Sequence, residues 1–212
     1  VATLHEQGGF LLKAAAVHKR TLEIDPRNVE IHIRLASIYH QLGLLSDAMS
    51  YYYSVAGILQ EQNETKLYQE VLLRMTSVEP NNVGIRIKLA EHFSGHEMVQ
   101  DAVEQFRTAC QQLLDIGRVE DYIKVAERML YHAPEETAAI KQLVRIYLDN
   151  GEAKRALAKL QQAARVDPED TDTLGLLMET FQSLEQPVKA NQVLREKAKL
   201  HDKRGEAPQA QQ

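Results

Sequence analysis

The 212-residue sequence contains a single cysteine, Cys110, and no tryptophan. One cysteine excludes a disulfide within the chain and is compatible with a reducing compartment, so we expect a cytoplasmic protein. No apolar run approaches the roughly 18–20 residues of a membrane-spanning helix, and no signal-peptide pattern is present. The net charge of −5 lacks the basic excess that is typical of nucleic-acid-binding proteins.

Motifs for catalysis are also missing. The sequence has no glycine-rich phosphate loop, no GxSxG, no HExxH and no CxxC. His92 and His96 have the i, i+4 spacing that a metal can use, but Ser94 and Gly95 between them favour a frayed and solvated helix end. The surroundings of Cys110 favour a buried packing thiol over a nucleophile. We therefore predict no catalytic residue, no metal and no cofactor.

The strongest pattern that is present is a 54-residue repeat. Residues 29–82 align without a gap on residues 83–136, with 13 identical positions. The identical residues are mostly apolar or small, at helical spacing: Val29/Val83, Ile31/Ile85, Ile33/Ile87, Leu35/Leu89, Ala36/Ala90, Asp47/Asp101, Ala48/Ala102, Leu59/Leu113, Tyr68/Tyr122, Val71/Val125, Arg74/Arg128, Met75/Met129 and Pro80/Pro134. A fixed period of this size indicates stacked units that bury their apolar faces against their neighbours.

Four prolines mark the ends of helical segments, because proline cannot continue a helix. They are Pro26, Pro80, Pro134 and Pro168. Apolar periodicity and these breaks predict at least eleven helices and no strands. We expect helices at residues 10–24, 29–42, 46–62, 65–78, 83–94, 98–116, 119–131, 135–150, 152–166, 170–184 and 188–200, with the end of an earlier helix at residues 1–7. Among the expected core residues at the two ends of the chain are Phe10, Leu11, Ala14, Ala15, Val17, Leu22, Ile24, Leu174, Leu177, Phe181, Ala190 and Leu194.

Two segments carry a resemblance to a known family. Leu-Ala-x-x-Tyr at 35–39 is followed by Gly43 and Ala48, and Leu143 and Tyr147 are followed by Gly151, Ala156 and an Asp-Pro pair. This pattern resembles the tetratricopeptide repeat family. The resemblance implies an all-α fold, a right-handed α-solenoid of stacked helix pairs with a superhelical course, whose first helices line a concave groove that holds a protein or peptide. The sequence is also similar to bacterial repeat arrays that dock regulatory partners such as small GTPases.

The repeats divide the chain into five parts. We expect a partial repeat at 1–28, expanded three-helix repeats at 29–82 and 83–136, a repeat at 137–170 and a C-terminal repeat or cap at 171–204. Residues 205–212 are expected to form a disordered tail. Because the sequence opens on Val1 within a helical pattern, we also expect it to be a fragment of a larger protein.

Basic residues recur at the positions that face the groove in this family: Arg34, Lys88, Arg107, Lys141 and Arg145. Guanidinium and ammonium groups bind carboxylates, so an acidic protein or peptide is the expected ligand. The alternative is an ordinary solvated helix face, since several acidic residues share this surface. Tyr51 or Tyr53 could add an exposed aromatic contact, and Tyr53 is included in the predicted site. Ile33 and Ile87 either face the groove or pack on the extra third helix.

Three functions remain compatible with the sequence. The leading one is a non-enzymatic protein-interaction scaffold, which the repeats and the missing catalytic motifs favour. The second is a structural spacer without a specific site. The third is a metal-dependent domain that would use His92 and His96.

Overall fold

The computed structural model describes residues 9–204, and within this range it contains eleven α-helices and no strand. The helices are α2 (Leu11–Ile24), α3 (Val29–Gln41), α4 (Leu45–Gln62), α5 (Thr65–Val78), α6 (Val83–Gly95), α7 (Val99–Asp115), α8 (Val119–His132), α9 (Thr137–Asp149), α10 (Ala153–Val166), α11 (Thr171–Ser183) and α12 (Pro187–Arg204). The predicted all-α class and the number of helices are confirmed. The helix end expected at residues 1–7 and the tail expected at 205–212 lie outside the described residues.

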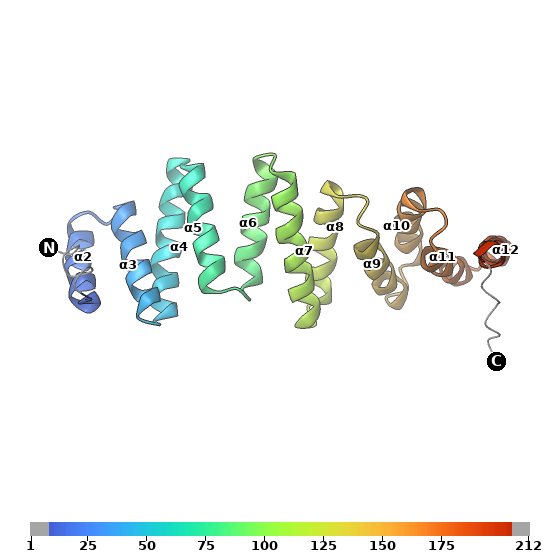
Figure 1. Cartoon of the computed structure of the whole chain (residues 1–212), viewed down its shortest axis with the longest axis horizontal. Coiled ribbons are helices and arrows are strands. Elements are labelled where there is room, and N and C mark those ends of the chain that lie inside the picture. Colours follow the sequence, from blue (N-terminus) through green and yellow to red (C-terminus); the bar gives the residue numbers. More distant parts are fainter. Residues whose placement is uncertain (1–8, 205–212) are drawn as a thin grey trace. The chain divides into compact units, whose positions relative to one another are not determined.

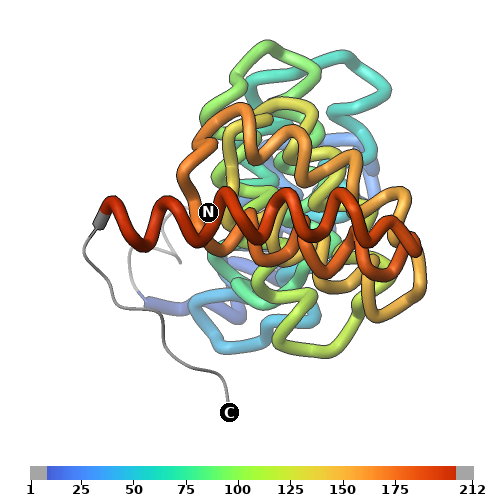
Figure 2. The backbone as a smooth tube through the Cα atoms, turned by 90° about the vertical axis from the view of Figure 1, so that its right-hand side faces the viewer, coloured from blue at the N-terminus to red at the C-terminus, as the bar shows by residue number. Residues whose placement is uncertain are grey.

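The chain forms two compact units that meet within α7, with residue 112 in the first and residue 113 in the second. In the first unit, each helix from α2 to α6 packs against the next one in sequence, as Figure 1 shows. In the second unit α8 contacts α9, α9 contacts α10, α10 contacts α11, and α11 contacts α12. Figure 2 shows α12 lengthwise, as one continuous helix at the C-terminal end of this unit. No helix in the described range is long and apolar enough to cross a membrane.

Helix starts recur at the period of the sequence. The helices α3, α4 and α5 begin at residues 29, 45 and 65, and α6, α7 and α8 begin at residues 83, 99 and 119, each 54 residues later. Both copies also open in the same way. The Asn28 side chain accepts a hydrogen bond from the backbone N–H of Ile31, and Asn82 accepts one from Ile85. An asparagine cap satisfies one of the N–H groups that the first turn of a helix leaves unpaired.

The loop before each of these helices is held by a side chain of the helix itself. The Nε2 atom of His32 lies 2.9 Å from the carbonyl oxygen of Pro26, and the Arg86 guanidinium donates to the carbonyl of Pro80 at 2.9 Å. Residues 32 and 86 are equivalent in the repeat, so two different side chains fix the same loop. The grouping into two three-helix repeats stays a prediction, although the helix starts and the loops follow it.

Helix ends show the same correspondence in their backbone. Gly43 and its equivalent Glu97 both have a left-handed backbone, with φ of 74° and 60°, as do Asn63 and its equivalent Gly117, with φ of 57° and 71°. Glycine adopts this conformation without steric cost and asparagine tolerates it. Glu97 is therefore the residue least suited to its turn.

Part of the core consists of residues that the two copies share. Six of the identical pairs are buried in both copies: Leu35/Leu89, Ala36/Ala90, Ala48/Ala102, Leu59/Leu113, Val71/Val125 and Met75/Met129. The expectation of burial is wrong for three terminal residues, Phe10, Ile24 and Leu194, which are 56%, 87% and 48% exposed. Phe10 precedes the first turn of α2, Ile24 is its last residue, and Leu194 lies in α12, the last described helix.

Candidate partner-binding site

A cavity of about 290 Å³ lies in the first unit, and three helices contribute to it. Its lining residues are Leu11 of α2, then Ile33, Arg34, Ser37, Ile38 and Gln41 of α3, and Arg74 of α5. We call it the Arg34–Arg74 pocket. It combines aliphatic side chains with two guanidinium groups, a hydroxyl and an amide. This composition suits a ligand that is partly apolar and carries negative charge.

Arg34 enters the pocket from α3 and is anchored one turn back along its own helix. Its Nε and Nη2 atoms donate to Oε1 of Glu30, at 3.0 and 2.8 Å. The Glu30 side chain is 72% exposed, so this ion pair is solvated and contributes only a few tenths of a kcal/mol, about 0.3–0.5 kcal/mol for an i, i+4 pair. A partner carboxylate could replace Glu30 at little cost.

Arg74 reaches the same pocket from α5 and is exposed. Its presence there follows from the way the chain folds back twice. The helix α4 packs against both α3 and α5, and Arg74 of α5 lines the pocket together with residues of α3. The sequence pattern identifies Arg74 as a repeated basic residue of the third helix but does not predict that it joins Arg34.

Lys88 lies elsewhere in the first unit. Its ammonium is 6.0 Å from the centroid of the Tyr53 ring, so α6 meets α4 there, and Lys88 does not line the Arg34–Arg74 pocket. Tyr53 is 46% exposed, while its neighbour Tyr51 stacks on Tyr39 with ring centroids 5.6 Å apart. Arg34 and Lys88, which are equivalent in the two copies, therefore lie in different surroundings.

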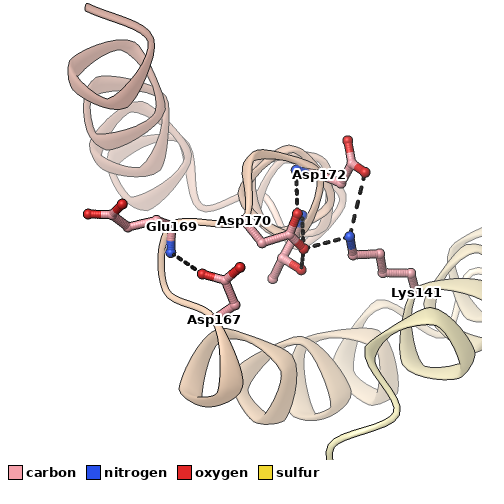
Figure 3. A network of polar contacts seen from close by, with 6 residues as sticks. Lys141, Asp167, Glu169, Asp170 and Asp172 are labelled. Atoms are coloured by element: carbon pink, nitrogen blue, oxygen red, sulfur yellow. Dashed lines mark hydrogen bonds and ion pairs between the residues drawn. The ribbon is translucent and has the colours of Figure 1, made fainter. Parts of the chain in front are cut away.

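Lys141, in the second unit, is bound within the chain. Figure 3 shows its ammonium between Asp170 and Asp172, with Nζ–Oδ2 distances of 2.6 and 3.5 Å. The side chain is 18% exposed. Burial alone would lower the pKa of Lys141, but the hydrogen bond and negative charge of Asp170, with those of Asp172, raise it above its ordinary value. This ion pair links α9 to the start of α11, because Asp170 also caps α11 through the N–H groups of Asp172 and Thr173.

The two remaining basic residues of the predicted site are exposed. Arg107 lies on α7 and Arg145 on α9. Arg145 and Lys141 belong to the second unit, whereas Arg34, Lys88 and Arg107 belong to the first. Within the first unit, Arg34 is the sequence-predicted residue that lines the Arg34–Arg74 pocket.

Cys110 and the pair His92 and His96 are the residues that the sequence offered for chemistry. Cys110 is buried, and burial raises the pKa of its thiol to about 12, so it is protonated and shielded at neutral pH, as expected of a packing residue. Between residues 9 and 204, no group of three or more His, Cys, Asp or Glu side chains is arranged to hold a metal. The helix α6 ends at Gly95 and the exposed His96 is its C-cap, so the two histidines lie at a solvated helix end, as expected.

The packing of the second unit decides the type of fold. Here α9 contacts α10, its partner in a helix hairpin, and also α11, the first helix of the next hairpin. Gly151 turns the first of these hairpins with a left-handed φ of 74°. The chain has a tetratricopeptide-like fold. The handedness of its superhelix stays a prediction.

Comparison with known proteins adds little to this tetratricopeptide-like assignment. No family model matches the sequence, and no curated protein matches it. Among solved structures, a MamA protein is 15% identical over 100% of this chain and 94% of its own, with a TM-score of 0.36. A MamA from Desulfovibrio magneticus RS-1 is 16% identical over 75% of this chain and 97% of its own, with a TM-score of 0.42. YrrB, described as a TPR protein with an unusual peptide-binding site, is 14% identical over 89% of this chain and 94% of its own, also with a TM-score of 0.42. Likenesses of this degree leave the partner and the site open.

Proposed function

We propose that the chain is a non-catalytic interaction scaffold that binds a protein partner through a short segment in which acidic and aliphatic residues alternate. The segment binds in the Arg34–Arg74 pocket. The observation that carries this proposal is the presence of two guanidinium groups from different helices around one cavity with aliphatic walls. The single cysteine and the composition favour a cytoplasmic setting.

The chemistry of recognition follows from the two arginines. A guanidinium binds a carboxylate through two parallel hydrogen bonds, which gives direction as well as attraction. Ile33, Ile38 and Leu11 provide contacts for an aliphatic side chain next to that carboxylate. Ser37 and Gln41 add a hydroxyl and an amide that can bond to the backbone of an extended segment.

The other basic residues have secondary roles in this proposal. Lys88 with Tyr53 offers a cationic and aromatic contact to a partner that extends around the first unit, and Arg107 adds charge to the same unit. Of the two predicted basic residues in the second unit, Arg145 is exposed and available to a partner, whereas Lys141 contributes mainly by holding Asp170. A regulatory protein with an acidic surface, such as a small GTPase, would satisfy this chemistry.

The test is a titration of the whole chain with a fluorescein-labelled synthetic peptide of alternating Glu and Leu, followed by fluorescence anisotropy. Arg74→Glu should weaken binding by about tenfold or more at low salt, because like charges are then juxtaposed, and salt should reduce the difference. The matched control is Arg128→Glu, which makes the same change at the equivalent position of the second copy. Thermal melts of both variants establish that the fold is intact.

Two outcomes would argue against the proposal. If wild type and Arg74→Glu bound the Glu-Leu peptide with equal affinity, the pocket would not be the binding site. If wild type bound a Gln-Leu peptide as tightly as the Glu-Leu peptide, recognition would not require a carboxylate. No binding of any acidic peptide would favour the structural spacer, whose surface carries no specific site.

A further inference from the structure

We propose that the first unit carries a second site, in which the imidazoles of His92 and His96 chelate one Cu²⁺ or Ni²⁺ ion. The site lies in a separate cavity of about 240 Å³, where the end of α4, the start of α5 and the end of α6 meet. The cavity is lined by Leu59, Gln60, Asn63, Glu64, Thr65, Tyr68, His92 and His96. The proposed peptide site makes no use of it.

The distance between the two rings fits coordination of one ion. Their centroids are 4.3 Å apart, with an angle of 38° between the ring planes. With metal–nitrogen bonds of about 2.0–2.1 Å and a ring radius of about 1.1 Å, two imidazoles at right angles around one metal have centroids about 4.5 Å apart. The observed spacing is close to that of the right-angled arrangement, which is the geometry of square and octahedral Cu²⁺ and Ni²⁺ sites.

The hydrogen bonding of His96 leaves a nitrogen ready for a metal. Its Nδ1 atom lies 2.7 Å from the backbone carbonyl oxygen of His92. A carbonyl oxygen only accepts, so Nδ1 carries the proton and Nε2 of the neutral ring has a free lone pair. A ring N–H bonded to a backbone carbonyl is also the usual way in which metal-binding histidines are oriented.

His92 is held in position by aromatic contacts. Its ring centroid lies 5.2 Å from that of Tyr68 on α5 and 6.4 Å from that of Phe93.

The remaining coordination positions would be taken by water and by the oxygens around the cavity. The carboxylate of Glu64 lines the cavity and supplies one negative charge. Since the described residues contain no group of three ready protein ligands, the ion should be exchangeable. Cu²⁺ is expected to bind more tightly than Ni²⁺, because affinity at nitrogen sites increases in that order.

The site belongs to one copy of the repeat alone. The positions equivalent to His92 and His96 in the first copy, 54 residues earlier, hold Ile38 and Leu42. The second copy thus has two histidines that share a cavity where the first copy has two aliphatic residues. A metal site would explain this difference.

The test is calorimetric titration of the metal-free whole chain with Cu²⁺ at neutral pH, with glycine as a competing chelator to suppress weak sites. One tight site should be found, and His92→Ala or His96→Ala should each weaken it by about tenfold or more, because a chelate becomes a single contact. The matched control is His40→Ala, which removes a histidine from the last turn of α3 and should leave the site unchanged. Electron paramagnetic resonance of the Cu²⁺ complex should show coupling to two imidazole nitrogens in wild type and to one in each single variant.

The proposal is overturned if the double variant His92→Ala, His96→Ala binds Cu²⁺ like wild type, or if the spectrum of wild type shows a single imidazole. Circular dichroism of each variant without metal establishes that loss of binding is not loss of folding. Failure of this test would leave the peptide site untouched, since the two cavities share no residue.

Discussion

The hydroxyl of Tyr147 on α9 donates a hydrogen bond of 2.6 Å to the carboxylate of Glu127 on α8. Arg155 of α10 contacts both residues. Its Nη2 atom donates to Glu127 at 3.1 Å and to the Tyr147 oxygen at 2.8 Å. Its guanidinium also lies 4.2 Å from the centre of the Tyr147 ring. Three successive helices of the second unit are thereby joined through one tyrosine that is otherwise buried.

Tyr147→Phe removes the hydroxyl and leaves the ring. Hydrogen bonds to charged groups contribute about 1.5–3 kcal/mol, and Glu127 is 40% exposed, so we expect the unfolding free energy to fall by about 1 kcal/mol. Urea denaturation followed by circular dichroism measures this change. Tyr131→Phe is the control, because Tyr131 is an exposed tyrosine of α8 and its loss should change stability by less than about 0.5 kcal/mol.

Acidification should weaken the same contact. Burial would raise the pKa of Glu127, but the hydrogen bonds from Tyr147 and Arg155 outweigh it and hold the pKa below the ordinary 4.5. The stabilisation is therefore complete above pH 4.5 and is lost as the pH falls through the lower, folded-state pKa. Glu127→Gln should be less stable than wild type at pH 7, and the difference should shrink below pH 4.5 in denaturation curves measured across this range. A constant difference would contradict this assignment.

Charge reversal should affect Lys141 and Lys88 differently. Lys141→Glu places a third carboxylate beside Asp170 and Asp172, at a position with 18% exposure, so the melting temperature should drop. Lys88→Glu changes an exposed side chain and should leave it nearly unchanged. Equal melting temperatures would mean that the Lys141 ion pair does not hold α9 to α11.

The helix periodicity was sufficient to predict the secondary structure, because it depends on local spacing and on proline. The predicted range 65–78 coincides with α5, and the other boundaries either coincide or differ by a few residues. The site was harder to predict, since it depends on contacts between distant residues. Asp170 lies 29 residues after Lys141, so the sequence around Lys141 does not reveal that an ion pair neutralises the charge of this lysine. Arg74 likewise meets Arg34 only because the chain reverses twice between them.

Truncating the repeated core should be costly in both copies. Leu35 and Leu89 are fully buried, and Leu→Ala at such positions costs about 2–5 kcal/mol. Each variant should therefore show a lower midpoint in chemical denaturation. Leu12→Ala, at a 67% exposed position of α2, is the control and should have little effect. Tolerance of Asp at either position 35 or 89 would show that the repeat register is wrong.

Glu97→Gly should stabilise the turn between α6 and α7. A left-handed backbone costs an ordinary residue roughly 1–2 kcal/mol, and glycine gives back about 0.5–1 kcal/mol through its greater freedom when unfolded. The net gain should be up to about 1 kcal/mol in unfolding free energy. Asn63→Gly should gain less, because asparagine tolerates this conformation. A loss of stability in Glu97→Gly would mean that the glutamate side chain makes a contact worth more than the strain.

The position of Arg34 and Lys88 affects which residues of the first unit a ligand would contact. A segment lying along one side of it meets α3 and then α5, so it contacts residues such as Arg34 and Arg74, which occupy unrelated places in the repeat. The residue equivalent to Arg34 in the second copy is Lys88, and Lys88 lies beside Tyr53 rather than in this pocket. The two equivalent basic residues therefore offer a ligand different surroundings within the first unit.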